Sequence, residues 1–196
     1  MCAHRIYVPD SVYDQFAEKL AAAAQKLVLG NGLEQGVTQG PMIDEAAVRK
    51  VEEHIGDALE KGARLVTGGQ RAALGGSFFE PTVLTGVTAA MKVAQEETFG
   101  PLAPLFRFST EEEVIERAND TEFGLASYFY TRDIGRVMRV SEELEYGMVG
   151  VNTAAIANEM APFGGVKQSG LGREGSRYGI EDYLEIKYVC LGGVNR

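Results

Sequence analysis

The chain has 196 residues, a net charge of −9 and 45% hydrophobic residues, which suits one sizeable soluble domain. Its acidic balance disfavours a nucleic-acid partner, and no apolar run approaches the roughly 20 residues of a membrane span. The two cysteines, Cys2 and Cys190, and the two histidines show no metal-ligand spacing. We therefore expect no metal, no membrane partner and a cytoplasmic protein with reduced thiols.

The N-terminal region predicts a strand followed by an amphipathic helix. Residues 5–8 form the strand, and Asp10 or Ser11 can cap the helix by accepting hydrogen bonds from free backbone N–H groups. Apolar residues at helical spacing predict the inward face, which comprises Val12, Phe16, Leu20 and Leu27. The Gly-Asn-Gly run at 30–32 ends the helix.

A second helix is predicted after Asp44, which can cap it. Its inward residues are Val48, Val51, Ile55 and Leu59. Gly62 follows the end of this helix, and residues 63–67 then predict a strand. The succession of helix, glycine and strand is typical of α/β proteins.

The next elements continue this succession. Residues 102–108 predict a buried strand, and Thr110 and Glu113 have the spacing of a capping box at the start of a helix. Strands are predicted at 125–130 and 147–152, with a helix between them. Since sites in open α/β sheets gather at the carboxyl ends of strands, Asn152 and the segment after it are site candidates.

A glycine-rich loop covers residues 162–176. Its segment 170–175 spells G-x-G-x-x-G, a pattern that binds dinucleotide phosphates only between the strand and the helix of a βαβ unit. The residues before it are rich in glycine and proline and show no strand pattern. A tight loop that leads into a short helix is therefore favoured over a phosphate cradle.

The last stretch, residues 183–190, alternates between apolar and polar side chains. It predicts a half-exposed strand with a free edge, which invites pairing with another subunit and hence a homo-oligomer. The predicted fold is thus an open, mostly parallel α/β sheet with flanking helices. We expect a main domain at 1–176 and a C-terminal helix and oligomerisation strand at 177–196.

Four segments together resemble the aldehyde dehydrogenase superfamily, and they are residues 96–101, 119–125, 147–152 and 162–174. Residues 96–106 and 178–188 are similar to the succinate-semialdehyde and glutarate-semialdehyde dehydrogenases. The resemblance covers the whole chain and implies the catalytic domain of such an enzyme. These enzymes oxidise an aldehyde with NAD or NADP: a cysteine thiolate attacks the carbonyl, a hydride leaves for the nicotinamide, and water hydrolyses the thioester.

The resemblance also implies roles for individual residues. Glu97 matches the glutamate that hydrogen-bonds the nicotinamide ribose, and Phe99 matches the aromatic residue packed beside it. Phe163 matches an aromatic residue that lines the aldehyde tunnel. Ala157 stands where the semialdehyde subgroup usually offers a serine to the substrate carboxylate, and Asn158 or a neighbouring backbone amide can compensate.

The resemblance is to the C-terminal portion of such an enzyme only. It implies that the nucleophilic cysteine lies just before Met1, that Cys2 is the neighbouring non-nucleophilic position, and that Arg173 braces the fold. The general base, the oxyanion-hole asparagine and the Rossmann half belong upstream. We therefore expect the chain alone to be inactive as a dehydrogenase. The alternative is a truncated, non-catalytic protein that keeps the fold and its oligomer contacts.

Overall fold

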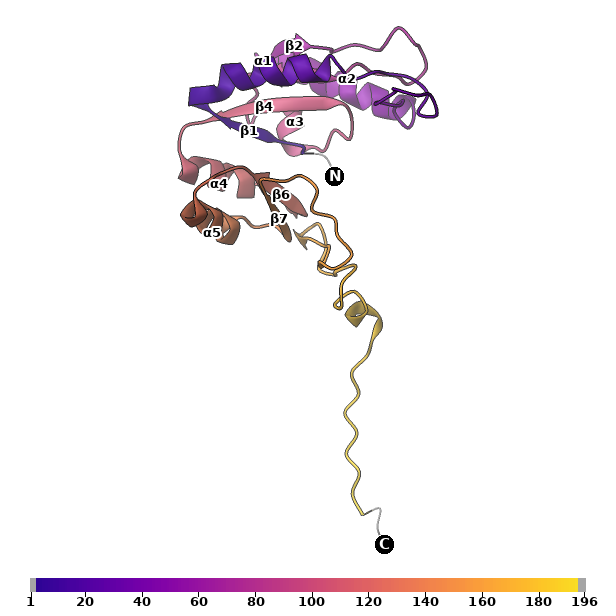
Figure 1. The fold of residues 1–196 in the computed structure, drawn as a ribbon, viewed down its shortest axis with the longest axis vertical. Coiled ribbons are helices and arrows are strands. Elements are labelled where there is room, and N and C mark those ends of the chain that lie inside the picture. The colour runs from indigo at the N-terminus through magenta and orange to yellow at the C-terminus, as the bar shows by residue number, and fades with distance from the viewer. Residues whose placement is uncertain (1–2, 194–196) are drawn as a thin grey trace. The chain divides into compact units, whose positions relative to one another are not determined.

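The computed structural model describes residues 3–193 (Figure 1). It divides into two compact units, with the boundary between Arg117 and Ala118. No helix in the described part of the chain is long and apolar enough to cross a membrane.

The first unit is built on a four-stranded sheet. Its order is β1 (Ile6–Pro9), β4 (Leu102–Phe108), β3 (Thr82–Thr85) and β2 (Arg64–Thr67). Strand β4 runs parallel to both β1 and β3, while β2 is antiparallel to β3. The predicted open, mostly parallel sheet is therefore confirmed, as is the strand predicted at 102–108.

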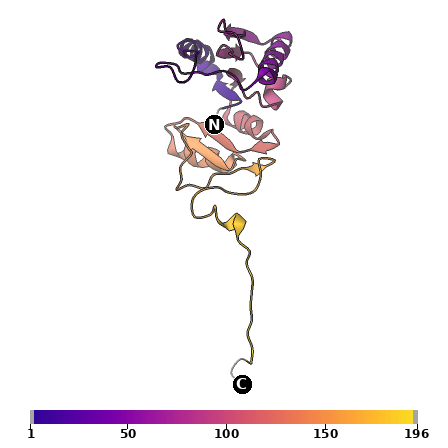
Figure 2. The ribbon, with the colours of Figure 1, turned by 90° about the vertical axis from the view of Figure 1, so that its right-hand side faces the viewer.

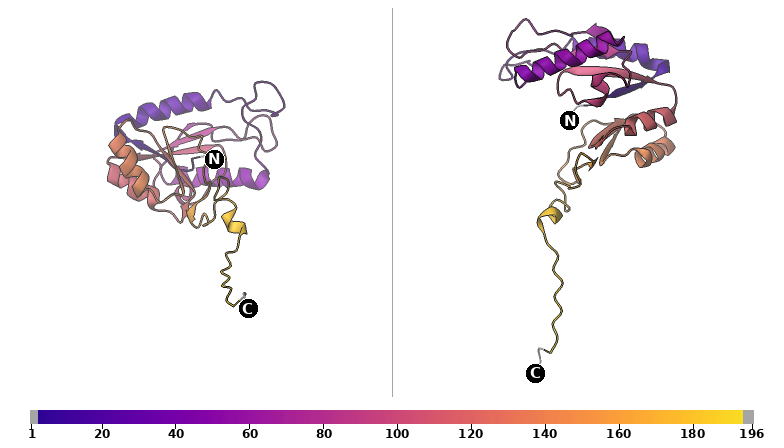
Figure 3. Two further views of the ribbon diagram at one scale, coloured as in Figure 1. Left: turned by 60° about the horizontal axis from the view of Figure 1, so that its bottom comes forward. Right: turned by 180° about the vertical axis from the view of Figure 1, so that it is seen from behind.

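Helices cover both faces of this sheet (Figures 2 and 3). Helix α1 (Tyr13–Ala24) packs on the face that carries Val83 and Leu105, and α2 (Glu45–Glu60) packs on the face that carries Phe106. Consecutive residues of a strand point to opposite faces, so β4 contributes alternately to the two cores.

The buried face of α1 differs from the predicted one. The side chains that are buried are those of Tyr13, Ala17 and Ala21. The predicted face stays partly exposed, at 43% for Val12, 39% for Phe16 and 42% for Leu27, and only Leu20 packs beside the core. The two alanines allow close approach of the helix to the sheet, and close packing favours this arrangement over one with larger side chains between them.

The predicted cap of α1 is also wrong. The N-cap position is Val12, and no side chain makes a capping hydrogen bond there. Asp10 lies in the short turn η1 (Asp10–Val12), where its carboxylate accepts a hydrogen bond from Ser109 Oγ at 2.7 Å. The carboxylate that was expected to cap the helix is therefore bonded to Ser109, which is distant in the sequence.

Helix α2 follows its prediction closely. Asp44 Oδ1 accepts a hydrogen bond from the backbone N–H of Ala47 at 2.8 Å, which confirms the cap. The buried side chains are those of Val48, Val51, His54, Ile55 and Ala58. Leu59, predicted to face inward, is 40% exposed, because Ala58 occupies the inward position of the last turn.

Two short helices complete this part of the chain, α3 (Lys92–Gln95) and α4 (Glu111–Asn119). The capping box before α4 is confirmed. The N–H of Glu113 donates to Thr110 Oγ1 at 3.2 Å, and the N–H of Thr110 donates back to Glu113 Oε2 at 3.4 Å.

The second unit contains a β-α-β crossover that comprises β6 (Ala126–Phe129), α5 (Ile134–Glu143) and β7 (Met148–Val151). Strands β6 and β7 pair in parallel, as expected for this connection. A second, two-residue pair joins β5 (Phe123–Gly124) and β8 (Val166–Lys167). The strands and the helix predicted for this region are confirmed.

The C-terminal segment, yellow in Figure 1, follows the short helix η2 (Glu181–Tyr183). Residues 184–193 form no strand in the single chain, although residues 183–190 were predicted as one. A strand needs a neighbour for its backbone hydrogen bonds, and the described residues of this unit offer none to this segment. Pairing of the segment with another subunit stays a prediction.

Candidate functional site

The loop between α3 and β4 carries both predicted cofactor-binding residues. Glu97 is exposed and Phe99 is 83% exposed, whereas Thr98 between them is only 7% exposed. The loop therefore turns one side chain inward and presents the two on either side of it at the surface. The structure thus brings Glu97 and Phe99 together on one short segment.

Phe99 has an unusual backbone. Its φ angle is 52°, in the left-handed region, where a bulky residue is a true outlier. Such a conformation costs on the order of 1–3 kcal/mol and persists only where its surroundings impose it. Strained residues of this kind cluster at functional sites, and this observation supports Phe99 as a site residue.

A buried histidine lies beneath this loop, and the sequence patterns did not single it out. His54 of α2 is 0% exposed, with its Nδ1 atom 2.9 Å from Thr98 Oγ1 and its Nε2 atom 3.3 Å from Glu96 Oε2. Its position among the apolar inward residues of α2 was the available signal. A buried polar group needs a partner, which here comes from a loop distant in the sequence.

His4 lies close to the same loop. Its Nε2 atom is 2.9 Å from the carbonyl oxygen of Val93. Burial lowers the pKa of His4, because the charged ring loses its hydration, while this backbone contact and the negative charge of Glu97 act in the opposite direction. The Glu97 carboxylate is therefore near enough to His4 to influence its charge.

The residues of this loop fit a ribose. An exposed carboxylate can accept hydrogen bonds from two adjacent sugar hydroxyls, and Glu97 offers such a group. The exposed ring of Phe99 can cover the apolar face of the same sugar. The chemistry of this pair therefore agrees with the nicotinamide-ribose contact implied by the sequence resemblance.

The predicted tunnel residue Phe163 lies in the second unit and is half-buried. It exchanges two backbone hydrogen bonds with Glu174: the N–H of Phe163 donates at 2.9 Å, and the N–H of Glu174 donates at 2.7 Å. The glycine-rich segment between them is thus closed into a tight loop. No helix begins directly after residue 175, which agrees with a tight loop and not with a phosphate cradle.

Ala157 is exposed in the segment that follows β7. The neighbouring Asn158 accepts a hydrogen bond from the N–H of Met160 through Oδ1 at 2.8 Å. That bond uses the amide oxygen and leaves the Nδ2 group to donate elsewhere. Asn158 can therefore offer a donor beside Ala157, whose methyl group has none.

Asn152, the candidate at the end of β7, is engaged with the chain itself. Its Oδ1 accepts from the N–H of Thr131 at 2.9 Å, and its Nδ2 donates to the carbonyl oxygen of Thr131 at 2.8 Å. Its φ angle is 57°. Both ends of the amide thus hold the turn after β6, which gives Asn152 a structural role.

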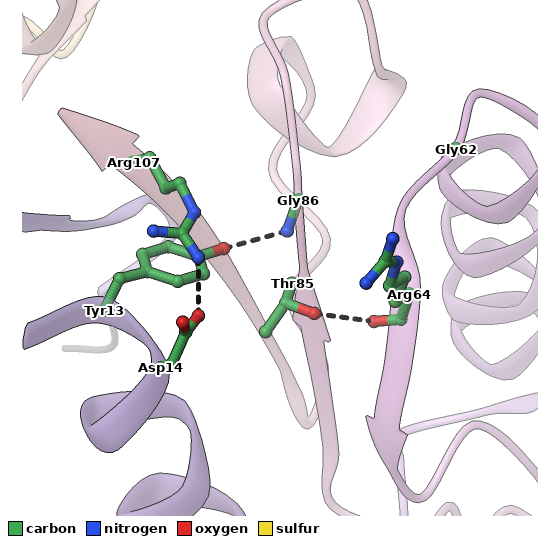
Figure 4. Close-up of a pocket in the computed structure, with 7 residues that line it drawn as sticks. All are labelled: Tyr13, Asp14, Gly62, Arg64, Thr85, Gly86 and Arg107. Carbon is green, nitrogen blue, oxygen red and sulfur yellow. Dashed lines mark hydrogen bonds and ion pairs between the residues drawn. The ribbon is translucent and has the colours of Figure 1, made fainter. Parts of the chain in front are cut away.

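A hollow of about 350 Å³ lies elsewhere in the first unit, and Figure 4 shows the residues that line it. The hydroxyl of Tyr13 donates to the carbonyl oxygen of Leu105 and accepts from the N–H of Gly86, each at 2.8 Å. Arg107 lies over the Tyr13 ring at 3.8 Å and pairs with Asp14. Because these groups bond to one another, we assign them to the packing of α1 on the sheet.

Two further predictions concern cysteine and metal. Cys2 lies outside the described residues 3–193. Across those residues, no group of three or more His, Cys, Asp and Glu side chains could hold a metal ion.

Comparisons with known sequences all lead to the same protein family. The sequence model of the aldehyde dehydrogenase family matches residues 1–189. The chain is 85% identical over 196 residues to a 3-sulfolactaldehyde dehydrogenase of Pseudomonas putida. This match covers 100% of the chain and 40% of that protein. The chain is 68% identical over 192 residues to a succinate-semialdehyde dehydrogenase of Escherichia coli strain K12 whose name specifies NADP(+), covering 98% of this chain and 40% of that protein.

Solved structures give the same result. The chain is similar to a crystal structure of succinate-semialdehyde dehydrogenase from Burkholderia pseudomallei, with a TM-score of 0.95 and 69% identity. That match covers 97% of this chain and 39% of the other. The chain therefore spans about 40% of the length of the relatives that it matches.

Proposed function

The chain belongs to the aldehyde dehydrogenase family, and from this membership we propose that it forms the C-terminal part of the catalytic domain of an NAD(P)-dependent enzyme. This enzyme oxidises a short aldehyde with an acid group at its far end to the corresponding acid. The observation that carries the proposal is the loop at 96–101, where Thr98 is buried and both Glu97 and Phe99 are exposed.

The loop supplies the contact with the cofactor. Glu97 accepts hydrogen bonds from the hydroxyls of the nicotinamide ribose, and Phe99 packs against the same sugar. The bound nicotinamide supplies the acceptor for a hydride. Fixing the ribose limits the orientations of the attached ring, and orientation contributes much of an enzyme's rate enhancement.

The segment after β7 and the glycine-rich loop supply part of the aldehyde path. Phe163 lines it, and Ala157 and Asn158 lie where the acid group of the substrate binds. Ala157 is smaller than serine and has no hydroxyl, which favours a bulkier acid group held by Asn158. A sulfonate is tetrahedral and larger than a planar carboxylate. The relative at 85% identity is named for a sulfonated aldehyde, which supports this preference.

The proposal is tested in a chimera in which this chain replaces the matching segment of the Pseudomonas putida relative. We expect NAD(P)-dependent oxidation of 3-sulfolactaldehyde, with succinate semialdehyde as the weaker substrate. Glu97→Gln in the chimera should lower kcat/KM about 10-fold, which corresponds to about 1.4 kcal/mol of lost transition-state stabilisation. Unchanged kinetics in this variant would argue against the ribose contact.

The chain by itself is the second arm of this experiment. We propose that it has no dehydrogenase activity alone, and measurable turnover by the pure chain would contradict that. A chimera that folds but oxidises neither aldehyde would instead favour the alternative of a non-catalytic protein.

A further inference from the structure

We propose that His54 and Thr98 are positioning residues that hold Glu97 and Phe99 in the orientation needed to bind the cofactor. This inference rests on the proposed function of the loop at 96–101. His54 and Thr98 lie behind the loop and would act through it, without touching the cofactor themselves.

The first part of the argument is the hydrogen bonding of the buried histidine. Glu96 offers only acceptor oxygens when ionised, so the Nε2 atom of His54 donates to it across 3.3 Å. When Nε2 carries the single ring proton, Nδ1 is an acceptor. The hydroxyl of Thr98 then donates to Nδ1 across 2.9 Å. The two ring nitrogens thus hold two residues of one loop, on either side of Glu97.

The second part is burial. His54 is 0% and Thr98 is 7% exposed, so water does not readily replace the bond between them. A buried polar group that loses its partner costs about 1–3 kcal/mol. That cost is avoided only while Thr98 points inward, and in this conformation of the loop Glu97 and Phe99 are both exposed.

The third part is a second contact on the same helix. A Cβ atom on Gly100 would lie 2.4 Å from Val51 Cγ2 and 3.1 Å from Met42 Cε, so the backbone of the loop lies directly against α2. Val51 and His54 are three residues apart and therefore share one face of the helix. The loop is attached to this face both at Thr98 and at Gly100.

Phe99 lies between these two attachments, which explains its backbone. With Thr98 and Gly100 both held, the peptide between them is forced into the left-handed region at a φ of 52°. Loss of either attachment allows Phe99 to return to an ordinary conformation. The side chains of Phe99 and Glu97 would then leave their orientation.

The test uses Thr98→Val and Thr98→Ser in the chimera described above. Valine removes the hydroxyl and keeps the shape, and we expect it to raise the KM for NAD(P) about 10-fold, with a smaller change in kcat. Serine keeps the hydroxyl and should restore a KM close to that of the parent. Thr82→Val is the matched control, because Thr82 is also buried and its hydroxyl bonds to Gly69 N and Glu80 O, neither of which belongs to the loop. Its backbone N–H donates to the carbonyl oxygen of Pro101 at 2.8 Å, and valine retains that bond. Thr82→Val should lower the unfolding midpoint and leave the KM for NAD(P) unchanged.

A readout independent of activity uses the chain itself. Chymotrypsin cleaves after exposed phenylalanine in flexible segments, so we expect Thr98→Val to speed cleavage after Phe99 several-fold, measured by mass spectrometry. Thr82→Val should not. His54→Leu removes both ring nitrogens, so it should speed cleavage at least as much as Thr98→Val does. The double variant should add little to His54→Leu, because the bond between the two residues is already lost.

The outcomes separate this inference from the proposed function. If Glu97→Gln impairs the chimera but Thr98→Val leaves both the KM for NAD(P) and the cleavage rate unchanged, positioning by His54 and Thr98 is wrong while the cofactor contact stands. Faster cleavage with an unchanged KM overturns the positioning role as well. If neither Glu97→Gln nor Thr98→Val changes the kinetics, while Thr98→Val still speeds cleavage, the proposed function of the loop is wrong.

Discussion

The Nη1 atom of Arg173 donates a hydrogen bond to the carbonyl oxygen of Gly165 at 2.6 Å. The same atom lies 2.9 Å from the carbonyl oxygen of Gly172. One guanidinium group thus joins the two sides of the loop whose ends are paired through Phe163 and Glu174. Arg173 is therefore part of the internal support of the loop that carries the proposed tunnel residue.

Arg173→Ala should loosen this loop. Hydrogen bonds from a charged donor contribute about 1.5–3 kcal/mol each, and their loss should speed amide hydrogen exchange at Phe163 and Glu174. The exchange is measured by mass spectrometry on the whole chain. Arg177→Ala is the control, since Arg177 stacks on the adjacent Tyr178 and should leave the loop unchanged. Equal exchange in the two variants would contradict the supporting role of Arg173.

Gly147→Ala should destabilise the second unit strongly. A Cβ atom at this position would lie 2.1 Å from the carbonyl oxygen of Gly164, so two backbone segments would have to separate. Overpacking of this kind costs about 1–3 kcal/mol or more, visible as a lower denaturation midpoint. Gly32→Ala is the control, because a Cβ atom there meets nothing within 4 Å. Similar midpoints for both variants would contradict the predicted clash.

We expect the helix cap formed by Asp133 to make a pH-dependent contribution to the free energy of unfolding. It caps α5 by accepting from the N–H of Arg136 at 2.8 Å, and this hydrogen bond holds the pKa of its carboxyl below the usual value. A carboxyl group with a lowered pKa in the folded state stabilises the fold above its unfolded pKa and ceases to do so as the pH falls through its folded pKa.

Asp133→Asn isolates this contribution, because asparagine keeps an acceptor oxygen but does not titrate. The wild-type chain should be more stable than the variant at neutral pH. Their difference should start to shrink below about pH 4, near the ordinary pKa of aspartate. Denaturation midpoints measured over a range of acidic pH values give the result, and a difference that persists unchanged to the lowest pH would show that the charge is irrelevant.

We expect substitutions in the C-terminal segment to change the oligomeric state. Ile186 is 100% and Tyr188 is 86% exposed in the single chain, and alternate residues of a strand share one face. If this segment pairs with another subunit, Ile186→Lys should reduce the molar mass measured by light scattering. Lys187→Gln, on the other face, is the control. An unchanged mass for Ile186→Lys would argue against assembly through this segment.

Features that depend on neighbouring residues were predictable from the sequence. Asp44 caps α2 across three residues, and Thr110 and Glu113 form a capping box over the same distance. These interactions involve side chains and backbone groups within a single turn. Their chemistry is therefore present in the order of the residues, and the start of each helix follows from it.

Features that depend on distant residues were decided by the tertiary structure. Tyr13 and Ala17 are buried on α1 because the helix packs closely against the sheet. The periodicity of apolar residues does not predict how closely a helix approaches its neighbour. The pairing of His54 with Thr98 spans 44 residues and joins a helix to a loop. The sequence motif predicts Glu97 and Phe99 as site residues, whereas their exposure is a feature of the folded loop. We infer that this orientation depends on the buried hydrogen bond between Thr98 and His54, which only the folded chain brings together.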